Sequence, residues 1–179
     1  MKRNIEEYLN AQKTIHKQLI NSDVNWAITG SFSLFLRGIQ IVPNDIDIIT
    51  DKNGAYKIEK QFQNFVYQNI HFKEIENIRS YFGVLLIDDI KIEIMGDIEN
   101  KFVSKNDWKP RSDWYLHKEF VIFDKTTFPV LSLEYECDVY LKIGRIQQAS
   151  IIIDYLKKNH WLRNENDENV LGNYELTIK

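Results

Sequence analysis

The sequence predicts an α+β fold, in which a mixed β-sheet is flanked by helices and followed by C-terminal helices. Three observations lead to this prediction. Residues 26–65 alternate between short apolar runs typical of strands and apolar stripes at helical spacing. Residues 80–94 alternate apolar and polar side chains, as the strands of a hairpin do. Residues 133–156 carry a long helical stripe, so the order of elements favours a sheet covered by helices.

The first elements are a helix over residues 5–19, a short apolar strand over residues 26–29, and a short buried helix that follows Gly30. Gly30 and Ser31 therefore form a corner between a strand and a helix. Glycine lets a backbone come close to a ligand, and the free N–H groups at a helix start suit an anionic group such as phosphate. We expect a phosphate group to bind at this corner. Arg37, near the end of the same helix, could lie either in the cleft or on the surface.

The next strand contains two acids, in the run Asp45-Ile46-Asp47-Ile48. Because side chains alternate along a strand, both carboxylates lie on one face and both isoleucines on the other. Two carboxylates spaced this way, about 6.6 Å apart at the backbone, repel each other by about 2 to 3 kcal/mol. An acidic pair close to a phosphate-binding corner indicates a divalent cation, and Mg²⁺ fits best because it takes one or two carboxylates together with substrate phosphates.

Gly30-Ser31, thirteen further residues and then Asp45-Ile46-Asp47-Ile48 resemble the signature of the polymerase-β-like nucleotidyltransferase superfamily. The most similar branches are the small stand-alone nucleotidyltransferases, which include lincosamide and aminoglycoside nucleotidyltransferases and the minimal forms of toxin–antitoxin pairs. The motif covers about the first third of the chain. The resemblance implies the nucleotidyltransferase fold and transfer of a nucleoside monophosphate from a nucleoside triphosphate, with two Mg²⁺ ions.

Further along the chain, Asn53-Gly54 predicts a turn before a second helical stripe that runs to Phe65. Residues 80–87 and 90–94, joined at Asp88-Asp89, predict a β-hairpin. In its second arm, isoleucines occupy one face, and Lys91 and Glu93 occupy the other.

The resembling family carries a third carboxylate on a later strand beside the acidic pair, and Glu93 takes that role here. Asp97 is the alternative candidate. Glu93 could instead be a simple ion-pair partner of Lys91 or of a lysine on a neighbouring strand.

Residues 101–128 show few regular signals apart from residues 119–123, which could form another strand. The region is rich in aromatic residues, and a long loop in a compact domain is often functional. Trp108 and Trp114 could stack on a nucleobase or an apolar acceptor, although packing in the core or in an interface is the more common role of such residues.

After Pro129, Ser132 is a candidate N-cap for the helical stripe, and Cys137 is expected to be a small buried side chain without reactivity. The family resembled here uses basic residues of a helix after the catalytic sheet to bind the triphosphate. Lys142 and Arg145 are the candidates for that role. A solvated face with salt bridges would explain them as well.

These elements predict a nucleotidyltransferase catalytic domain over residues 1–130, a C-terminal helical segment over residues 131–160 packed on it, and a polar tail over residues 161–179. The net charge of −3 gives no global support for nucleic-acid binding. No apolar run is long enough to span a bilayer, and Cys137 is the single cysteine, so we expect a cytoplasmic protein without an internal disulfide.

The sequence therefore predicts a metal-dependent nucleotidyltransferase that acts on a hydroxyl of a small molecule or a protein. In this hypothesis Asp45, Asp47 and Glu93 hold two Mg²⁺ ions, while Gly30, Ser31, Lys142 and Arg145 bind the nucleotide. Glu93 completes the second metal site or takes the proton of the acceptor. The alternative is a non-catalytic nucleotide-binding or partner-binding module on the same fold. The preferred nucleobase and the oligomeric state are not determined by the sequence.

Overall fold

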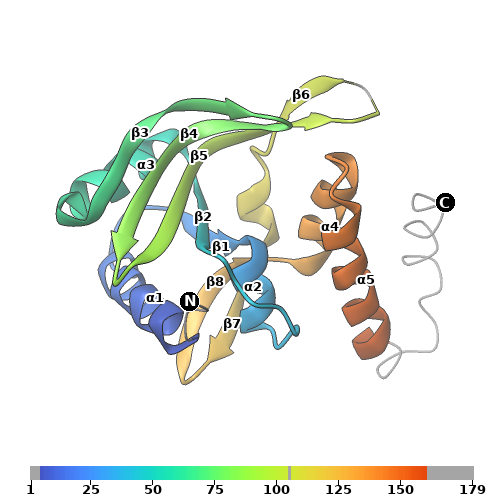
Figure 1. Ribbon diagram of the computed structural model, residues 1–179, viewed down its shortest axis with the longest axis horizontal. Coiled ribbons are helices and arrows are strands. Elements are labelled where there is room, and N and C mark those ends of the chain that lie inside the picture. The colour runs from blue at the N-terminus through green and yellow to red at the C-terminus, as the bar shows by residue number, and fades with distance from the viewer. Residues whose placement is uncertain (1–4, 105, 161–179) are drawn as a thin grey trace.

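The computed structural model describes residues 5–104 and 106–160, and these form a mixed sheet with helices on both faces (Figure 1). The helices are α1 (Ile5–Leu19), α2 (Gly30–Leu36), α3 (Lys52–Gln61), α4 (Leu133–Lys142) and α5 (Ile146–His160), with 3₁₀ turns η1 (Gln63–Phe65) and η2 (Trp114–His117). The strands are β1 (Trp26–Thr29), β2 (Ile46–Thr50), β3 (Val66–Ile75), β4 (Ile78–Ile87), β5 (Ile90–Phe102), β6 (Asp107–Pro110), β7 (Lys118–Phe123) and β8 (Thr126–Leu131).

The eight strands lie in one sheet with the order β3-β4-β5-β2-β1-β8-β7, and β6 pairs with β5. Strand β2 runs parallel to β5, and β1 runs parallel to β8, whereas the other pairs are antiparallel. The predicted hairpin is confirmed as β4 and β5, which meet at Asp88-Asp89 in the left-handed region. The α+β fold with a mixed sheet and C-terminal helices is also confirmed.

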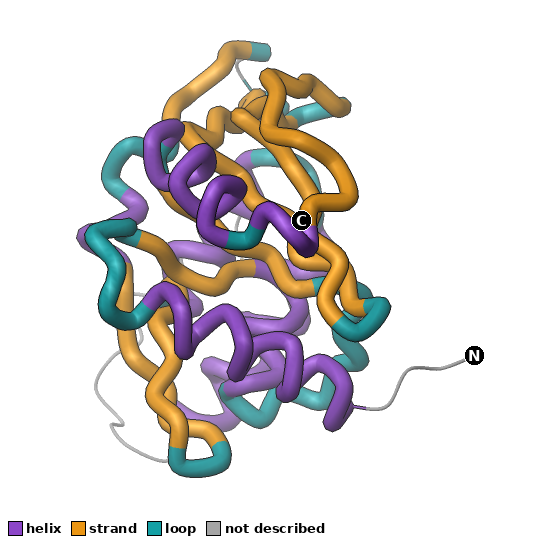
Figure 2. Tube along the Cα trace, turned by 90° about the vertical axis from the view of Figure 1, so that its left-hand side faces the viewer, coloured by secondary structure: helices purple, strands orange, loops and turns teal. Residues whose placement is uncertain are grey.

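The two faces of the sheet have different partners. The alternate isoleucines of β2 and β5 point toward α1 and α3 and are fully buried in the main core. Figure 2 views the molecule from this side, with helices lying across the front of the strands. The opposite face of β2 and β5 carries the acids and faces α4. A second core, formed largely by α4 and α5, lies beyond it.

The aromatic region contains β6, η2, β7 and β8, and the strand expected over residues 119–123 is confirmed as β7. Its strands are short. Pro129 does not end the region, because it is part of β8. Trp114 is buried in a third core cluster, and the Arg79 guanidinium lies 4.6 Å above the Trp108 ring. The two tryptophans therefore pack against other parts of the protein, which is the more common of the two roles considered for them.

Helix α4 begins as the sequence predicted, because the Ser132 hydroxyl accepts a hydrogen bond from the N–H of Tyr135 at 3.3 Å. It ends before Gly144, where a φ of +79° breaks the helical stripe into α4 and α5. Helix α3 begins earlier than the predicted Asn53-Gly54 turn, because Asp51 caps it. Cys137 is buried, and burial raises the pKa of its thiol to about 11, so it is unreactive at neutral pH.

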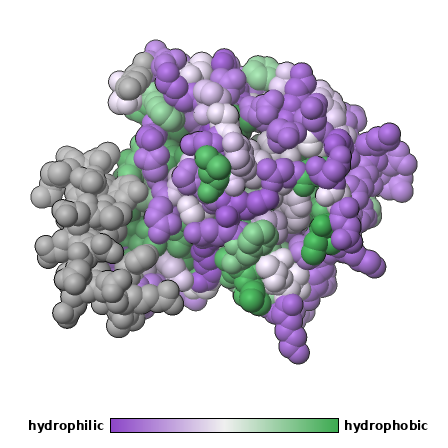
Figure 3. Space-filling view, turned by 180° about the vertical axis from the view of Figure 1, so that it is seen from behind, coloured by the Kyte–Doolittle hydropathy of each residue, from purple (hydrophilic) through white to green (hydrophobic). Residues whose placement is uncertain are grey.

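The face seen from behind is mostly hydrophilic, with separate small hydrophobic groups (Figure 3). Among residues 5–104 and 106–160, no helix is both long enough and apolar enough to cross a lipid bilayer. The polar tail expected over residues 161–179 lies outside the described residues, so the proposed division of the chain stays a prediction.

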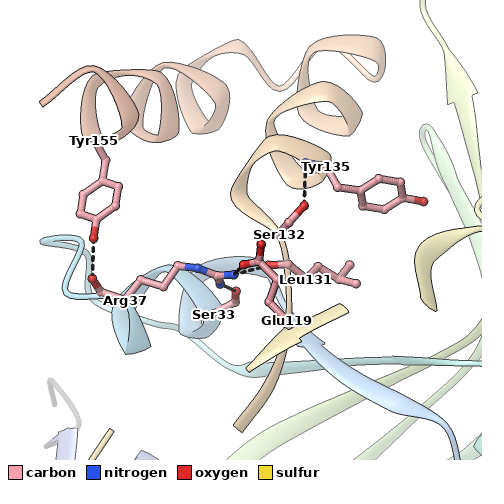
Figure 4. Close-up of polar contacts among 7 residues, drawn as sticks. All are labelled: Ser33, Arg37, Glu119, Leu131, Ser132, Tyr135 and Tyr155. Atoms are coloured by element: carbon pink, nitrogen blue, oxygen red, sulfur yellow. Dashed lines mark hydrogen bonds and ion pairs between the residues drawn. The ribbon is translucent and has the colours of Figure 1, made fainter. Parts of the chain in front are cut away.

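Arg37 lies neither in the cleft nor free on the surface, because its side chain joins three elements (Figure 4). The guanidinium donates hydrogen bonds to Oγ of Ser33 at 3.0 Å, to Oε2 of Glu119 at 2.8 Å and to the carbonyl of Leu131 at 2.7 Å. The carbonyl of Arg37 accepts a hydrogen bond from the Tyr155 hydroxyl at 2.9 Å. Arg37 thereby ties α2 to β7, β8 and α5.

We expect Arg37→Leu to lower the free energy of unfolding by about 2–4 kcal/mol, because it removes charge-assisted hydrogen bonds from a side chain that is only 8% exposed. Lys13→Ala is the control, since Lys13 pairs with Asp124 where both side chains are exposed. It should change the free energy by less than about 1 kcal/mol. Urea titrations of both variants measure the difference, and equal losses would contradict the role given to Arg37.

Candidate active site

The corner between β1 and α2 is shaped by a carboxylate. Gly30 has a backbone φ of +71°, which side chains with a Cβ rarely allow. A Cβ atom at this position would also lie 2.1 Å from Oδ2 of Asp47. Position 30 therefore requires glycine for two reasons, its backbone angle and the close contact with Asp47. The sequence predicted that a ligand approaches this corner, which stays a prediction, and the protein group that lies closest to it is Asp47.

Strand register brings the predicted acids to the same place. Thr29, the last residue of β1, lies opposite Asp47 of β2, and Asp47 lies opposite Glu93 of β5. Asp45 precedes β2 by one residue, on the same side of the strand as Asp47. The structure thus brings Asp45, Asp47 and Glu93 together beside Gly30, although they come from separate parts of the sequence.

Burial raises the pKa of all three acids, and neighbouring carboxylates add to the effect for Asp47 and Glu93. Burial is the main cause for Asp47, whose pKa lies well above its ordinary value, and the charges of Asp45, Glu93 and Glu136 add to it, while Arg145 lowers it. Burial also raises the pKa of Asp45, against the opposing charge of Lys91. Glu93 has its pKa raised by burial and by Asp45. A cluster of this kind disfavours its own ionised state, which is typical of functional sites.

Glu136 is a fourth acid that sequence reasoning missed. It is buried on α4, where Oε1 accepts hydrogen bonds from the Thr29 hydroxyl and from the N–H of Gly30, the latter at 3.1 Å. Glu136 lies one helical turn before Tyr140, on the buried side of the α4 stripe. An acid at such a position was the signal that could have identified it. Its contacts fix α4 against the corner.

A cavity of about 120 Å³ lies between the acidic face of the sheet and α4. Its polar lining comes from four separate parts of the chain and includes Asp47, Glu93, Asn100, Arg111, Glu136 and Arg145. Arg145 follows Gly144 at the break between α4 and α5. Within residues 5–104 and 106–160, its guanidinium forms neither an ion pair nor a hydrogen bond. It is therefore the predicted basic residue that reaches the acids.

The other predicted residues lie outside this cavity. Lys142 forms an ion pair with Asp138 at 2.5 Å, and its ammonium lies 5.4 Å from the centre of the Phe102 ring. Ser31 is half-buried in the first turn of α2. Asp97, the alternative third acid, is exposed at a left-handed position with a φ of +46°.

A second cavity, of about 150 Å³, adjoins the first and shares Glu93 and Arg145 with it. It continues across β4 to β3, where Lys73 and Phe82 line it and the Lys73 ammonium lies 4.1 Å above the Phe82 ring. Glu93 therefore stands between two cavities. One cavity extends toward α4 and the other toward the edge of the sheet.

The donor set fits Mg²⁺ in its chemistry. Asp45, Asp47 and Glu93 offer only carboxylate oxygens, which are the ligands that Mg²⁺ prefers, and a cation would relieve their mutual repulsion. In the part of the chain that the structure describes, no three His, Cys, Asp or Glu side chains are arranged to hold a metal ion as they stand. Binding an ion therefore requires these carboxylates to reorient.

The chain matches the model of the family described as aminoglycoside-2''-adenylyltransferase over residues 12–154. It is 43% identical to a protein from Thermotoga maritima described as a candidate nucleotidyltransferase. That match covers 89% of this chain and 97% of the other, with a TM-score of 0.73. The comparison with curated protein sequences finds no match.

Two more distant structures share the fold. The lincosamide antibiotic adenylyltransferase LnuA, solved with lincomycin, is 11% identical over 85% of this chain and 98% of its own, with a TM-score of 0.52. The antibiotic-resistance factor ANT(2'')-Ia is 11% identical over 84% of this chain and 85% of its own, with a TM-score of 0.53. At this identity, the likeness supports the architecture alone.

In metal-free buffer at neutral pH, we expect Asp47→Asn to raise the free energy of unfolding. Because the pKa of the folded-state carboxyl lies above its unfolded value, the folded protein binds more protons than the unfolded chain between the two values. Stability therefore falls as the pH rises through this window, and the amide should remove that loss. Thermal melts from about pH 4 to about pH 8 measure the effect.

The control for this experiment is Asp138→Asn, which removes an exposed carboxylate paired with Lys142. It should not stabilise the protein, because its charge is screened and favourably paired. A lower melting temperature for metal-free Asp47→Asn than for the wild type at neutral pH would show that Asp47 is not a strained buried acid.

Proposed function

Because the chain belongs to the aminoglycoside-2''-adenylyltransferase family and is therefore a nucleotidyltransferase, we propose that it is a metal-dependent enzyme that transfers a nucleoside monophosphate to a hydroxyl of a small molecule. The observation that carries this proposal is the pairing of Asp47 and Glu93 in parallel register beside Gly30. It supplies acids for a metal at the corner where a phosphate is expected.

Asp45, Asp47 and Glu93 would hold Mg²⁺. When bound, the metal supplies positive charge that polarises the triphosphate and lowers the pKa of the acceptor hydroxyl. Asp47 lies deepest of the three, close to Gly30. Two ions, as the resemblance implies, would be shared among these carboxylates.

Arg145 binds the triphosphate in this proposal. Its guanidinium lies in the cavity beside the acids and has no protein partner among the described residues. A guanidinium pairs well with phosphate oxygens and neutralises the negative charge that develops on pyrophosphate as it leaves. Ser31 adds its hydroxyl at the corner. Lys142 would have to leave Asp138 before it could take part.

Glu93 is proposed as the general base. It stands between the two cavities, and burial with the Asp45 charge raises its pKa, which strengthens it as a base. Glu93 takes the proton of the acceptor hydroxyl while the oxygen of that hydroxyl forms a bond to the α-phosphorus. The bond between the α-phosphorus and the bridging oxygen breaks, and pyrophosphate leaves with that electron pair.

The acceptor lies on the Lys73 side of Glu93 in this proposal. The cavity there is about 150 Å³ in volume, and it combines the Phe82 ring with charged groups of both signs. This size suits part of a small hydroxylated molecule. The family is described by its action on aminoglycosides, which are small hydroxylated compounds. The two features favour a small molecule over a protein acceptor.

We expect Asp45→Asn, Asp47→Asn and Glu93→Gln each to reduce nucleotidyl transfer by at least about a hundredfold, because each removes a charge that positions the metal or takes the proton. Pyrophosphate release with each triphosphate and a panel of hydroxylated acceptors measures transfer. Asp97→Asn is the matched control, since Asp97 is exposed and asparagine tolerates its left-handed backbone. If Asp97→Asn lost activity and Glu93→Gln kept it, Asp97 would be the third acid of the site in place of Glu93.

We further expect Mg²⁺ to raise the melting temperature of the wild type and to raise that of Asp47→Asn much less, because the metal binds the folded state through this carboxylate. Differential scanning fluorimetry with magnesium chloride, and with sodium chloride at equal ionic strength, measures the shift. Equal shifts in both proteins would place the metal elsewhere.

A further inference from the structure

Two side chains that line the cavity under α4 carry buried polar atoms without a hydrogen-bond partner. Asn100 of β5 is 1% exposed, and both atoms of its amide lack a hydrogen bond. Arg111, which follows β6, is 8% exposed, and its Nη2 lacks one too. A buried polar group without a partner is costly, so such groups are rarely left unpaired without a reason. Neither residue has a part in the metal and phosphate chemistry described above.

Arg111 is held in place from outside the cavity. Its guanidinium lies 4.8 Å from the centre of the Tyr135 ring, and the His117 ring stacks on the same tyrosine at 4.3 Å. The Tyr135 hydroxyl donates a hydrogen bond to Asp113 at 2.9 Å. This support fixes the guanidinium while leaving Nη2 free, as a preorganised binding group requires.

The unpartnered atoms define the chemistry of a ligand. Oδ1 of Asn100 requires a donor, whereas its Nδ2 and the Nη2 of Arg111 require acceptors. A phosphate or carboxylate offers acceptors alone and would leave Oδ1 without a partner. The edge of a nucleobase offers a donor next to an acceptor, and asparagine pairs with such an edge through both atoms of its amide.

The shape of the cavity fits the same ligand. Apolar side chains line its walls, with Met95 and Ile98 on the sheet, Val139 on α4 and Ile143 directly after α4. The volume of about 120 Å³ is close to that of a cavity that holds benzene, so it has room for the ring of a base, and the sugar and phosphates of a bound nucleotide would extend into the adjoining cavity of about 150 Å³. A sugar ring carries hydroxyls around its edge and would place some of them against the apolar walls.

We propose that Asn100 and Arg111 form a subsite for the nucleobase of the nucleoside triphosphate, between β5 and α4. This inference rests on the proposed nucleotidyl transfer, because it assigns one end of the same cavity. Arg145 and Glu93, which line both cavities, would bind the phosphates and metal where the cavities meet, and Asn100 reads the base inside the smaller one. The apolar walls enclose the ring between them.

The test compares Asn100→Leu and Asn100→Asp with the wild type for binding of the four common nucleoside triphosphates and of inorganic tripolyphosphate, with Mg²⁺, by calorimetry. Leucine keeps the size of the side chain and removes both hydrogen bonds, and aspartate keeps the shape and removes the donor. We expect either change to weaken the tightest-binding nucleotide about tenfold or more. Asn100→Leu should leave tripolyphosphate unchanged, whereas Asn100→Asp adds a negative charge and should weaken tripolyphosphate too, but less than the nucleotide.

Gln12→Met is the matched control. Gln12 is a second buried amide without partners, but it lies on α1, away from both cavities, so nucleotide binding should not change. Thermal melts show whether each variant is folded, and the aspartate variant carries the test if the leucine variant is not.

Four results would overturn the inference. Equal weakening of nucleotide and tripolyphosphate would assign Asn100 to the phosphates. Unchanged nucleotide binding with a raised KM for the acceptor in the transfer assay would assign Asn100 to the acceptor, and no change in either measurement would mean that the cavity holds only ordered water. A wild type that binds neither nucleotide nor tripolyphosphate would overturn the proposed function as well, whereas the first three results leave that function intact.

Discussion

The contact between the Asp47 carboxylate and the backbone of Gly30 is the constraint on which the site depends. It exists because Thr29 lies opposite Asp47 in the β1–β2 ladder, so the turn into α2 meets the acidic face of β2. Glycine is needed there for its backbone angle and for its lack of a Cβ atom. Glu136 then holds the same corner from α4 through the N–H of Gly30. A strand, a helix start and a second helix are thereby fixed around one carboxylate.

Buried like charges oppose folding, and the other face of the same strands offsets them. Ile46 and Ile48 of β2 and Ile92 and Ile94 of β5 are fully buried against α1 and α3. Burial of each such side chain contributes about 1.5–3 kcal/mol, which is comparable to the repulsion between neighbouring carboxylates. Because side chains alternate along a strand, the isoleucines on one face stabilise the strand register. The other face can then carry carboxylates that repel one another.

The break at Gly144 places a basic residue on the helical side of the cavity, opposite the acids of the sheet. If α4 continued, Arg145 would follow the direction set by Asp138 and Lys142, which pair with each other near the surface. The left-handed glycine turns the chain, and Arg145 then lies beside Asp47 and Glu93. Acids on the sheet therefore face the Arg145 guanidinium from the helical side. This arrangement suits a ligand that carries both a metal ion and phosphate groups.

The sequence by itself determined the features that depend on local patterns. These are the Gly30 corner, the placement of Asp45 and Asp47 on one strand face, the β4–β5 hairpin and the Ser132 cap, because turns, alternation and caps involve neighbouring residues. The strand expected over residues 119–123 is β7, whereas β6 and β8 escaped prediction, since they are short and β8 contains a proline. Only the tertiary structure showed that Arg37 is a buried link and that Lys142 faces away from the acids. Glu136 lies 106 residues from Gly30 in the chain, and Asn100 and Arg111 approach α4 only when the sheet has formed. Contacts of this kind leave no periodic signal, because packing between distant elements creates them.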